Sequence, residues 1–238
     1  MQAKLTSQLP LVGYLEETGG GVRSFIAVLA FFLAHIPLAL SMHAFTWVAT
    51  LHALATLLAG LIWIALRQHE ERAAYVAAYI TGAEVLWRMN HANVFWEYGK
   101  YASVVILVFG MLRAGRLRPS FLPILYFALL LPSILLTADY LGLDEARKQL
   151  SFNLSGPFAL MIAVIFFSGL KFQQQQLHRL LMIMVGPIVG ILTLSVFKLS
   201  TVSALNFSAG SSNFAGSGGF GPNQVSAVLS MGALMCFF

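Results

Sequence analysis

Long apolar runs, separated by short polar segments, occupy most of the chain. A helix needs about 20 apolar residues to cross a hydrocarbon core of roughly 30 Å, and the runs have about that length. None of them alternates with a period of two, as the strands of a membrane barrel do, so the pattern predicts helices. We predict about eight spans, at Ser24–Leu40, Phe45–Leu66, Ala73–Met89, Lys100–Leu112, Ser120–Ala138, Phe152–Leu170, Leu180–Phe197 and Gln224–Phe238.

The predicted spans differ in how clearly the pattern defines them. The first two are joined by a tight connection around Pro37–His43. The third carries the polar residues Thr81, Glu84 and Arg88 and is the least typical. The fourth is short, and its helix can be extended back toward Trp96.

Composition agrees with a membrane location. The 238 residues are 58% hydrophobic and 10% charged, whereas a soluble domain is about 45–50% apolar and about 25% charged. A bilayer accepts an apolar exterior, because lipid tails contact it in place of water. The predicted fold class is therefore an all-α, polytopic transmembrane helical bundle, with a cytoplasmic N-terminal segment at 1–23 and one transmembrane domain at 24–238.

The formal net charge of +5 has an explanation that involves no nucleic acid. Cytoplasmic loops of membrane proteins are enriched in Lys and Arg. With a cytoplasmic N-terminus, nine of the 14 basic residues lie in inside segments, namely Lys4, Arg23, Arg67, Arg72, Arg113, Arg116, Arg118, Lys171 and Arg179. The outer segments hold the other five, namely Arg88, Lys100, Arg147, Lys148 and Lys198. The asymmetry favours a multi-pass protein whose surroundings are membrane lipid.

Motifs for nucleotide and metal chemistry are absent from the sequence. There is no GxxxxGK[ST] loop and no HExxH sequence, and the six histidines lack the spacing of paired ligands. The one cysteine, Cys236, excludes an intrachain disulfide and a Cys-based metal site. We therefore predict no metal site and no cofactor, and we interpret the histidines as packing or interface residues.

A polar cluster interrupts the apolar pattern between Glu84 and Lys100. Glu84 and Arg88 are four residues apart, so they share a helix face and can pair. Charges inside a span are costly and usually face the protein interior or a water-filled cavity. On the predicted topology the cluster, which includes His91 and Glu97, lies at the outer boundary. Either Arg88 and Lys100 bind a phosphate or pyrophosphate, or the charges form ion pairs that fix helix packing.

The segment Asn206–Gln224 is rich in Gly, Ser and Asn, and we predict neither helix nor strand there. Its composition favours a flexible outer loop. A second interpretation is a loop whose backbone amides approach a polar ligand closely. Pro222 is predicted to end the loop and begin a helix. The candidate site residues of this loop are Gly218, Gly219, Gly221 and Asn223, and the candidate Lys198 precedes the loop in the sequence.

Two Gly-Pro pairs, Gly156–Pro157 and Gly186–Pro187, fall inside predicted spans. Membrane helices tolerate proline because neighbouring helices satisfy the freed backbone groups, so we interpret the pairs as kinks. The alternative is a pair of broken helices at a transport site. The sequence shows no convincing internal repeat to support that alternative.

Two stretches carry a resemblance to bacterial O-antigen ligases and O-antigen polymerases, the membrane enzymes that handle lipid-linked polysaccharide. The first is Tyr79-Ile-Thr-Gly-Ala-Glu-Val-Leu-Trp-Arg-Met, followed by Phe95-Trp-Glu-Tyr-Gly-Lys-Tyr101. The second is Gly218-Gly-Phe-Gly-Pro-Asn-Gln-Val-Ser226, just before the last span. With the span pattern, the resemblance covers most of the chain, and each motif alone is moderately specific.

The resemblance implies metal-independent glycosyl transfer at the outer face of the inner membrane. It implies a glycan on undecaprenyl pyrophosphate as donor, and lipid A–core or another lipid-linked glycan as acceptor. Much of the family's site lies in a C-terminal half that this sequence does not contain, so no catalytic residue is carried over. Arg88, Lys100 and Lys198 are pyrophosphate candidates from charge and topology alone.

The last apolar run, Gln224–Phe238, has 15 residues, which is about 22 Å of helix, and no polar flank follows it. We therefore expect an incomplete chain that does not catalyse glycan transfer by itself. The alternative functions are a transporter or flippase for lipid-linked glycans and a non-catalytic membrane scaffold.

Overall fold

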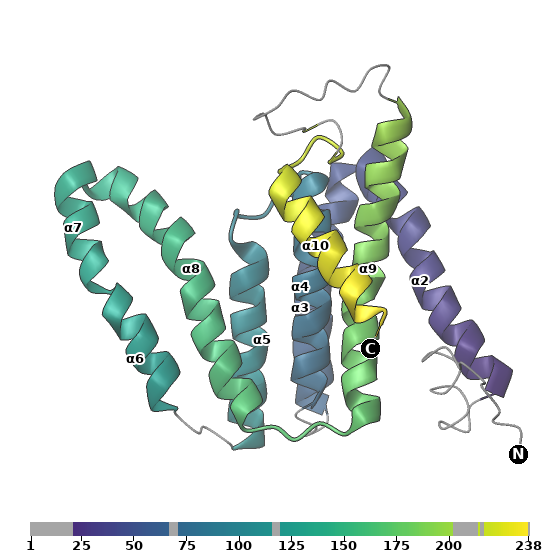
Figure 1. Cartoon of the computed structure of the whole chain (residues 1–238), viewed down its shortest axis with the longest axis horizontal. Coiled ribbons are helices and arrows are strands. Elements are labelled where there is room, and N and C mark those ends of the chain that lie inside the picture. The colour runs from purple at the N-terminus through teal and green to yellow at the C-terminus, as the bar shows by residue number, and fades with distance from the viewer. Residues whose placement is uncertain (1–20, 67–70, 116–119, 202–213, 215–216, 238) are drawn as a thin grey trace, which may run out of the picture.

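The structure, a computed structural model, describes residues 21–66, 71–115, 120–201, 214 and 217–237. All regular secondary structure in these ranges is helical, which confirms the all-α fold class. The predicted segment 1–23 lies almost wholly outside the described residues. In chain order the helices are α2 (Gly21–Ala44), α3 (Thr46–Leu66), α4 (Glu71–Met89), α5 (Tyr98–Ala114), α6 (Phe121–Leu130), α7 (Pro132–Leu141), α8 (Leu143–Ser168), α9 (Gln174–Thr201) and α10 (Pro222–Met235), and Figure 1 shows them side by side.

Five helical stretches in the described part of the chain are long and apolar enough to cross a membrane. They are Phe25–Ala44, Thr46–Leu66, Phe121–Leu141, Asp144–Ser168 and Gln174–Thr201. The other helices fall short, because α5 has 17 residues and α10 has 14, while α4 has 19 residues of which four are charged. Several such helices are what a multi-pass membrane protein requires. The number of about eight spans stays a prediction.

The predicted connection around Pro37–His43 is wrong. α2 continues through Pro37 to Ala44, and the chain turns at Phe45. A proline removes one helical hydrogen bond, and a membrane helix tolerates that loss. Pro37 was therefore a misleading signal for a break.

The spans predicted at Ser120–Ala138 and Phe152–Leu170 leave a connection between them, but only Gly142 interrupts the helical backbone between Ala138 and Phe152. Gly142 has φ 76° and ψ 162°, a conformation that is readily adopted only by glycine. One residue therefore reverses the chain between α7 and α8. Asp144 and Glu145 fill the first turn of α8, where negative side chains stabilise the helix dipole.

Prolines have different effects in the second half of the chain. The fifth predicted span, Ser120–Ala138, is divided at Leu131, because Pro132 begins a new helix and has no N–H to continue the old one. In contrast, α8 is continuous through Pro157 and α9 through Pro187. The broken-helix alternative is therefore wrong at both Gly-Pro pairs.

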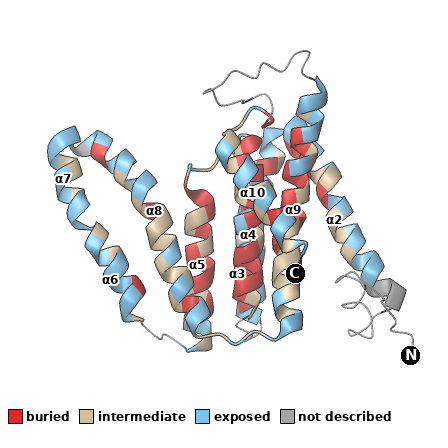
Figure 2. Ribbon diagram, viewed as in Figure 1, coloured by how far each residue is buried: buried red, intermediate tan, exposed pale blue. Residues whose placement is uncertain are grey.

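α4 lies at the centre of the bundle, packed against α9, α5 and α3. Of its 19 residues 13 are buried, and Figure 2 shows the buried residues concentrated on α4 and its neighbours. Small side chains let membrane helices approach closely. At Gly82 even a methyl group would overlap the carbonyl oxygen of Met184 on α9, so the two backbones are in contact.

α6 and α7 form an arm at the edge of the bundle, which packs mainly on α8. Pro123 is the one buried residue of α6, and α7 has none. α8 joins this arm to the core chiefly through its packing on α5. In Figure 1 the arm stands on the side of the bundle opposite to α2.

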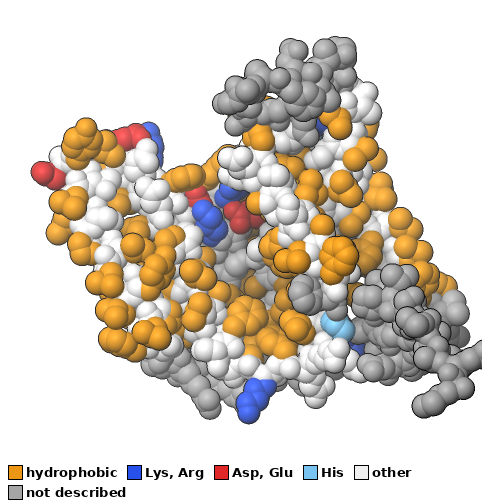
Figure 3. Space-filling model, viewed as in Figure 1, with side chains coloured by type: hydrophobic (Ala, Val, Ile, Leu, Met, Phe, Trp, Pro, Cys, Tyr) orange, Lys and Arg blue, Asp and Glu red, His pale blue; other side chains and the backbone are white. Residues whose placement is uncertain are grey.

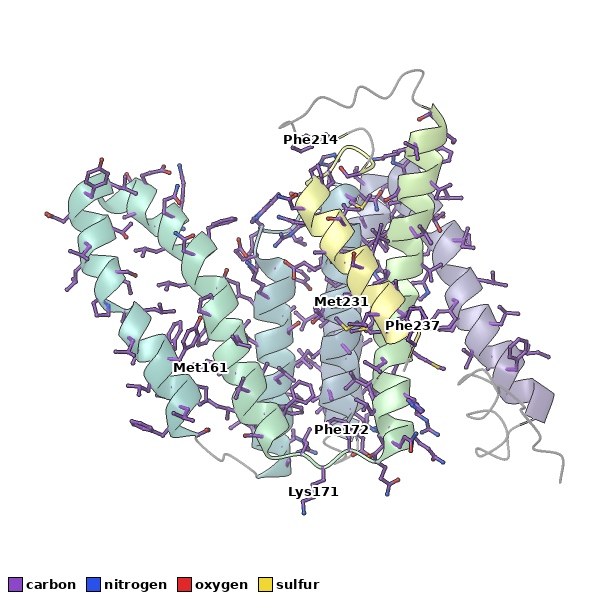
Figure 4. The ribbon with its side chains drawn as sticks, in the orientation of Figure 1. Met161, Lys171, Phe172, Phe214, Met231 and Phe237 are labelled. Carbon is purple, nitrogen blue, oxygen red and sulfur yellow. The ribbon has the colours of Figure 1, made fainter. Side chains whose placement is uncertain are left out.

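The alternating helices separate the two predicted groups of basic residues. Lys171 lies at one end of the bundle and Phe214 near the other (Figure 4). Arg72 in the first turn of α4 and Arg113 in the last turn of α5 lie at the Lys171 end, which we call the basic end. Lys100, in the first turn of α5, lies at the opposite end, which we call the site end.

Candidate functional site

The candidate site is built on the turn between α4 and α5 at the site end. α4 ends at Met89 and α5 begins at Tyr98, so the chain reverses within eight residues, 90–97. Gly99 lies directly against the Glu84 side chain, where a methyl group would come within 2.7 Å of its Cγ. The missing side chain at position 99 therefore lets the two helices bring their charged residues together.

Two acids and two bases form one network at this turn. Arg88 pairs with Glu84, which confirms the pairing predicted from their spacing. Lys100 Nζ lies 2.5 Å from Glu97 Oε2, and an Arg88 nitrogen lies 3.8 Å from the same oxygen. The exposed fraction of the side chain is 5% for Glu97, 12% for Arg88 and 28% for Lys100. The charges cancel in number, and Lys100 is the member that solvent reaches most.

Ser155 connects this network to α8. Its hydroxyl lies 3.0 Å from Glu97 Oε2 and can donate to it, while Lys100 Nζ donates to Ser155 Oγ at 3.2 Å. Ser155 is itself buried. Sequence reasoning missed this residue, because a single serine in an apolar run gives no signal of a distant partner.

Arg88 is held by three further groups. Its guanidinium donates to the Trp96 carbonyl at 2.7 Å and lies over the Trp96 ring, 4.7 Å from the centroid. It also reaches Gln224 Oε1 on α10 at 3.5 Å. Within the described residues, Arg88 Nε and Glu97 Oε1 are buried without a hydrogen-bond partner. The Arg88 guanidinium thus already has several partners, whereas Glu97 Oε1 can still accept a hydrogen bond.

A cleft of about 560 Å³ opens beside the network, between the turn and the start of α8. Trp96, Glu97 and Phe152 line it, together with the basic residues Arg147 and Lys148. Figure 3 shows acidic and basic side chains gathered in a hollow between the arm and the rest of the bundle. Lys148 approaches Glu145 at 3.5 Å, but both are exposed, so that pair is weak. The cleft therefore adds positive charge to a neutral network.

A second hollow of about 370 Å³ lies between α4, α5, α8 and α9. Apolar side chains make up most of its wall, including Leu107, Leu160 and Phe167. Glu84 and Lys100 also line it. Because Lys100 contacts Glu97, which lines the cleft, the cleft with its charged residues and this apolar groove meet at the ion pair.

Lys198 and the glycine loop lie apart from this network. Lys198 is near the end of α9, beside Gly218 and Gly219, and none of the ion pairs seen among the described residues includes it. Gly218 has φ 72° and Gly219 has φ 79°, which explains two of the glycines in the loop. Only Phe214 and residues 217–221 of the predicted loop before Pro222 are described, and they are not helical.

The predicted helix start at Pro222 is confirmed. Pro222 is the first residue of α10 and follows Gly221 as N-cap, a position where the missing proline N–H costs nothing. Asn223 is exposed, and Gln224 in the same turn is the residue that reaches Arg88. Of the predicted loop candidates, Gly221 and Asn223 are the ones next to Gln224 or within three residues of it along the chain.

Two histidines and a tyrosine form a partly buried hydrogen-bonded chain that sequence reasoning did not connect. Trp87 Nε1 donates to His52 Nδ1 at 2.9 Å, and His52 Nε2 lies 3.1 Å from the Tyr79 hydroxyl. The hydroxyl lies 3.0 Å from His35 Nε2, and His35 Nδ1 lies 2.8 Å from the Phe31 carbonyl. Because the indole N–H donates to His52 Nδ1, that nitrogen carries no proton, so His52 is neutral and its Nε2–H donates to the Tyr79 hydroxyl. This hydrogen-bonded chain ties α2 and α3 to α4.

Neither these histidines nor any other residues of the described chain gather three or more His, Cys, Asp or Glu side chains that could hold a metal ion. Comparison of the chain with protein-family models, with curated proteins and with solved structures finds no match. The argument for function therefore rests on the residues and the geometry of the site.

Proposed function

We propose that the protein is a glycosyltransferase of the O-antigen ligase or O-antigen polymerase type, in the bacterial inner membrane with a cytoplasmic N-terminus. In this proposal the basic end faces the cytoplasm, as the excess of Lys and Arg there favours. The site end then faces outward and binds a glycan carried on undecaprenyl pyrophosphate. The stretches that suggest the family, at 79–89 and 95–101, meet at this end.

One observation carries the proposal, namely that a cleft lined by charged residues and an apolar groove meet at the Glu97–Lys100 ion pair. A lipid-linked glycan has the same two parts, since a charged pyrophosphate joins a sugar to a hydrocarbon chain. The groove offers a surface for the chain and the cleft offers room for the charged group. The junction of the two is where the pyrophosphate would lie.

The cations divide into two roles in this proposal. Lys100 is the most exposed member of the network and can turn from Glu97 to a phosphate oxygen. Arg147 and Lys148 line the cleft and add positive charge to it, and such cations suit phosphate binding. Arg88 positions the turn, because Glu84, Trp96 and Gln224 already bind its guanidinium.

The experiment measures lipid binding by the chain in nanodiscs, with undecaprenyl pyrophosphate as the probe and undecaprenol, which lacks the pyrophosphate, for comparison. Lys100→Ala and the double variant Arg147→Ala/Lys148→Ala should each weaken pyrophosphate binding roughly tenfold, the usual worth of a charge-assisted contact. Lys171→Ala at the basic end is the matched control and should bind normally. Binding of undecaprenol should not change in any variant.

A transfer assay completes the test. Lipid-linked O-antigen is supplied with lipid A–core in one reaction and with a second lipid-linked glycan in another, and longer products are resolved on a gel. Product above a no-protein reaction supports the transferase, and the acceptor used separates ligase from polymerase. Equal pyrophosphate affinity of the wild type and Lys100→Ala would contradict the binding site. Tight binding without product in either reaction is the result expected if this chain does not catalyse transfer by itself, so the pyrophosphate measurement is the one that decides the binding site.

A transporter of lipid-linked glycans is less well supported. Such proteins bind substrate where helices are interrupted near the middle of the membrane. α8 and α9 pass Gly156 and Gly186 without a break. The network also lies at one end of the bundle, where it suits a reaction at one face.

A further inference from the structure

A third hollow, the aromatic pocket, lies behind the turn and is distinct from the cleft and from the apolar groove. It has a volume of about 400 Å³, within the range of about 300–1,000 Å³ that small-molecule sites occupy. Trp96 lines both the cleft and this pocket and stands between them. Glu84 and Arg88 form part of the pocket wall. The pocket therefore adjoins the charge network without containing Lys100, Arg147 or Lys148.

Aromatic rings form much of this pocket. Trp87, Phe95, Trp96 and Tyr98 all line it. The polar atoms of the two buried rings are already bonded to α3, since Trp87 Nε1 donates to His52 and Tyr98 Oη to the Ala53 carbonyl at 2.9 Å. What these rings offer the pocket is therefore their carbon surface.

Two exposed polar side chains, His91 and Asn93, complete the lining. In the described chain neither of these side chains has a hydrogen-bond partner. Asn93 has an amide that both donates and accepts, and a neutral imidazole does the same. The pocket thus combines apolar faces with free donors and acceptors, and it lacks the surplus of cations found in the cleft.

His91 is held in an unusual backbone conformation at this pocket. Its φ is 52°, and it is the one non-glycine residue with positive φ in the described chain. It follows the end of α4, where its own N–H donates to the Arg88 carbonyl at 3.1 Å and the next N–H, of Ala92, to the Trp87 carbonyl at 3.0 Å. That pattern usually carries glycine in the left-handed position. Strained positions of this kind concentrate at functional sites.

We propose that this pocket binds a neutral sugar residue, as a carbohydrate subsite of the proposed transferase. A pyranose has C–H faces that pack on aromatic rings and hydroxyls at its edge that exchange hydrogen bonds. Phe95 supplies such a ring face, the edge of Trp96 borders it, and His91 and Asn93 supply the hydrogen bonds. The inference rests on the proposed function, because a transferase needs a site for a sugar beside the pyrophosphate. The competing explanation is that exposed Phe95 and Trp96 simply belong to the aromatic belt at the membrane surface.

The test uses the chain in nanodiscs and the free sugars glucose, galactose and N-acetylglucosamine as probes. Saturation-transfer NMR titrations give a dissociation constant for each sugar. Phe95→Leu should abolish the signal of the sugar that binds, and Asn93→Ala should weaken its binding roughly fivefold, the usual worth of a hydrogen bond. Phe45→Leu is the matched control, because Phe45 is 56% exposed, Phe95 is 58% exposed, and Phe45 lies outside the pocket.

His91→Gly separates a binding role from a structural one. Glycine relieves the left-handed conformation, so the melting temperature should rise by roughly 1–3 °C. Sugar binding should nevertheless weaken roughly fivefold, because the imidazole is lost. A rise in melting temperature together with weaker sugar binding would show that His91 serves the binding site at the expense of stability. A purely structural histidine would leave sugar binding unchanged.

The proposal is overturned if none of the three sugars gives a signal, or if the signal survives in both Phe95→Leu and His91→Gly. These outcomes do not affect the pyrophosphate site, because that site is measured with undecaprenyl pyrophosphate, which carries no sugar. Loss of pyrophosphate binding in Lys100→Ala with no sugar signal in the wild type would therefore refute this inference alone. The reverse result would refute the pyrophosphate site and keep the sugar pocket.

Discussion

α4 and the arm of α6 and α7 place their side chains in opposite surroundings. α4 carries Glu84, Arg88, Gly and several Ala, and 13 of its 19 residues are buried. The arm is formed largely of leucine, phenylalanine and other apolar residues, yet only Pro123 of its two helices is buried. Leu129 is 70% exposed and Leu135 is 76% exposed. The apolar helices α6 and α7 are therefore on the outside, and α4, which mixes charged, small and apolar residues, is on the inside.

The difference follows from the solvent. In water an apolar helix would be buried, but lipid tails accept its side chains as well as protein does. A helix with charges and small residues gains more from the interior, where its charges find partners and its backbone approaches other helices closely. The exposed apolar side chains of α6 and α7 are thus what a lipid environment predicts, whereas small and charged residues mark α4, the helix at the core and the site.

The largest difference between the two regions should appear when a large side chain is added. Gly82→Leu would drive a side chain into the backbone of α9 at Met184, and we expect a loss of about 3 kcal/mol of stability or more. Ala128→Leu introduces the same side chain at an exposed position of α6 and should change stability by less than about 0.5 kcal/mol. Thermal unfolding in detergent measures both variants. Similar melting temperatures for the two would refute the backbone contact between α4 and α9.

A smaller effect is expected from removing one hydroxyl. Tyr79→Phe breaks the chain from Trp87 to His35 in the middle, and leaves His52 Nε2 and His35 Nε2 without partners in the interior. Unsatisfied buried groups cost about 1–3 kcal/mol, so we expect a loss of about 2 kcal/mol. Tyr126→Phe on the arm is the control, because Tyr126 is 45% exposed, and it should be neutral. Equal stability of the two variants would show that this hydrogen-bonded chain contributes nothing.

Much of the fold could be predicted from the sequence, because apolar runs of membrane length are a direct physical requirement. The pairing of Glu84 and Arg88 was also predictable, since four-residue spacing fixes it on a helix. The boundaries at Pro37 and at 139–150 could not be predicted, because proline tolerance and a one-residue turn at Gly142 depend on tertiary context. Local signals therefore defined the helices better than their ends.

The candidate site was predictable only in part. The sequence placed Glu97 and Lys100 near Arg88, and the structure joins them in one network. Ser155 and Gln224 are 58 and 136 residues away from their partners Glu97 and Arg88, so no local pattern could reveal them. Lys198 was grouped with Arg88 because both lie in outer segments. The structure instead puts Lys198 beside Gly218. Counting basic residues in the outer segments cannot tell two separate positions at the same end of the bundle apart.

The smallest effect should come from shortening one leucine in each region, and it tests the solvent argument most directly. Leu86 on α4 is fully buried and Leu129 on α6 is 70% exposed. In a bilayer the unfolded reference for Leu86 is already apolar, so Leu86→Ala loses only its packing and leaves a cavity. We expect about 1–2 kcal/mol, less than the 2–5 kcal/mol typical of a core leucine in a soluble protein. Leu129→Ala should cost less than about 0.5 kcal/mol, because lipid fills the space. Unfolding in nanodiscs measures both, and a Leu129→Ala loss equal to that of Leu86→Ala would mean that the arm is packed against protein where the structure shows it exposed.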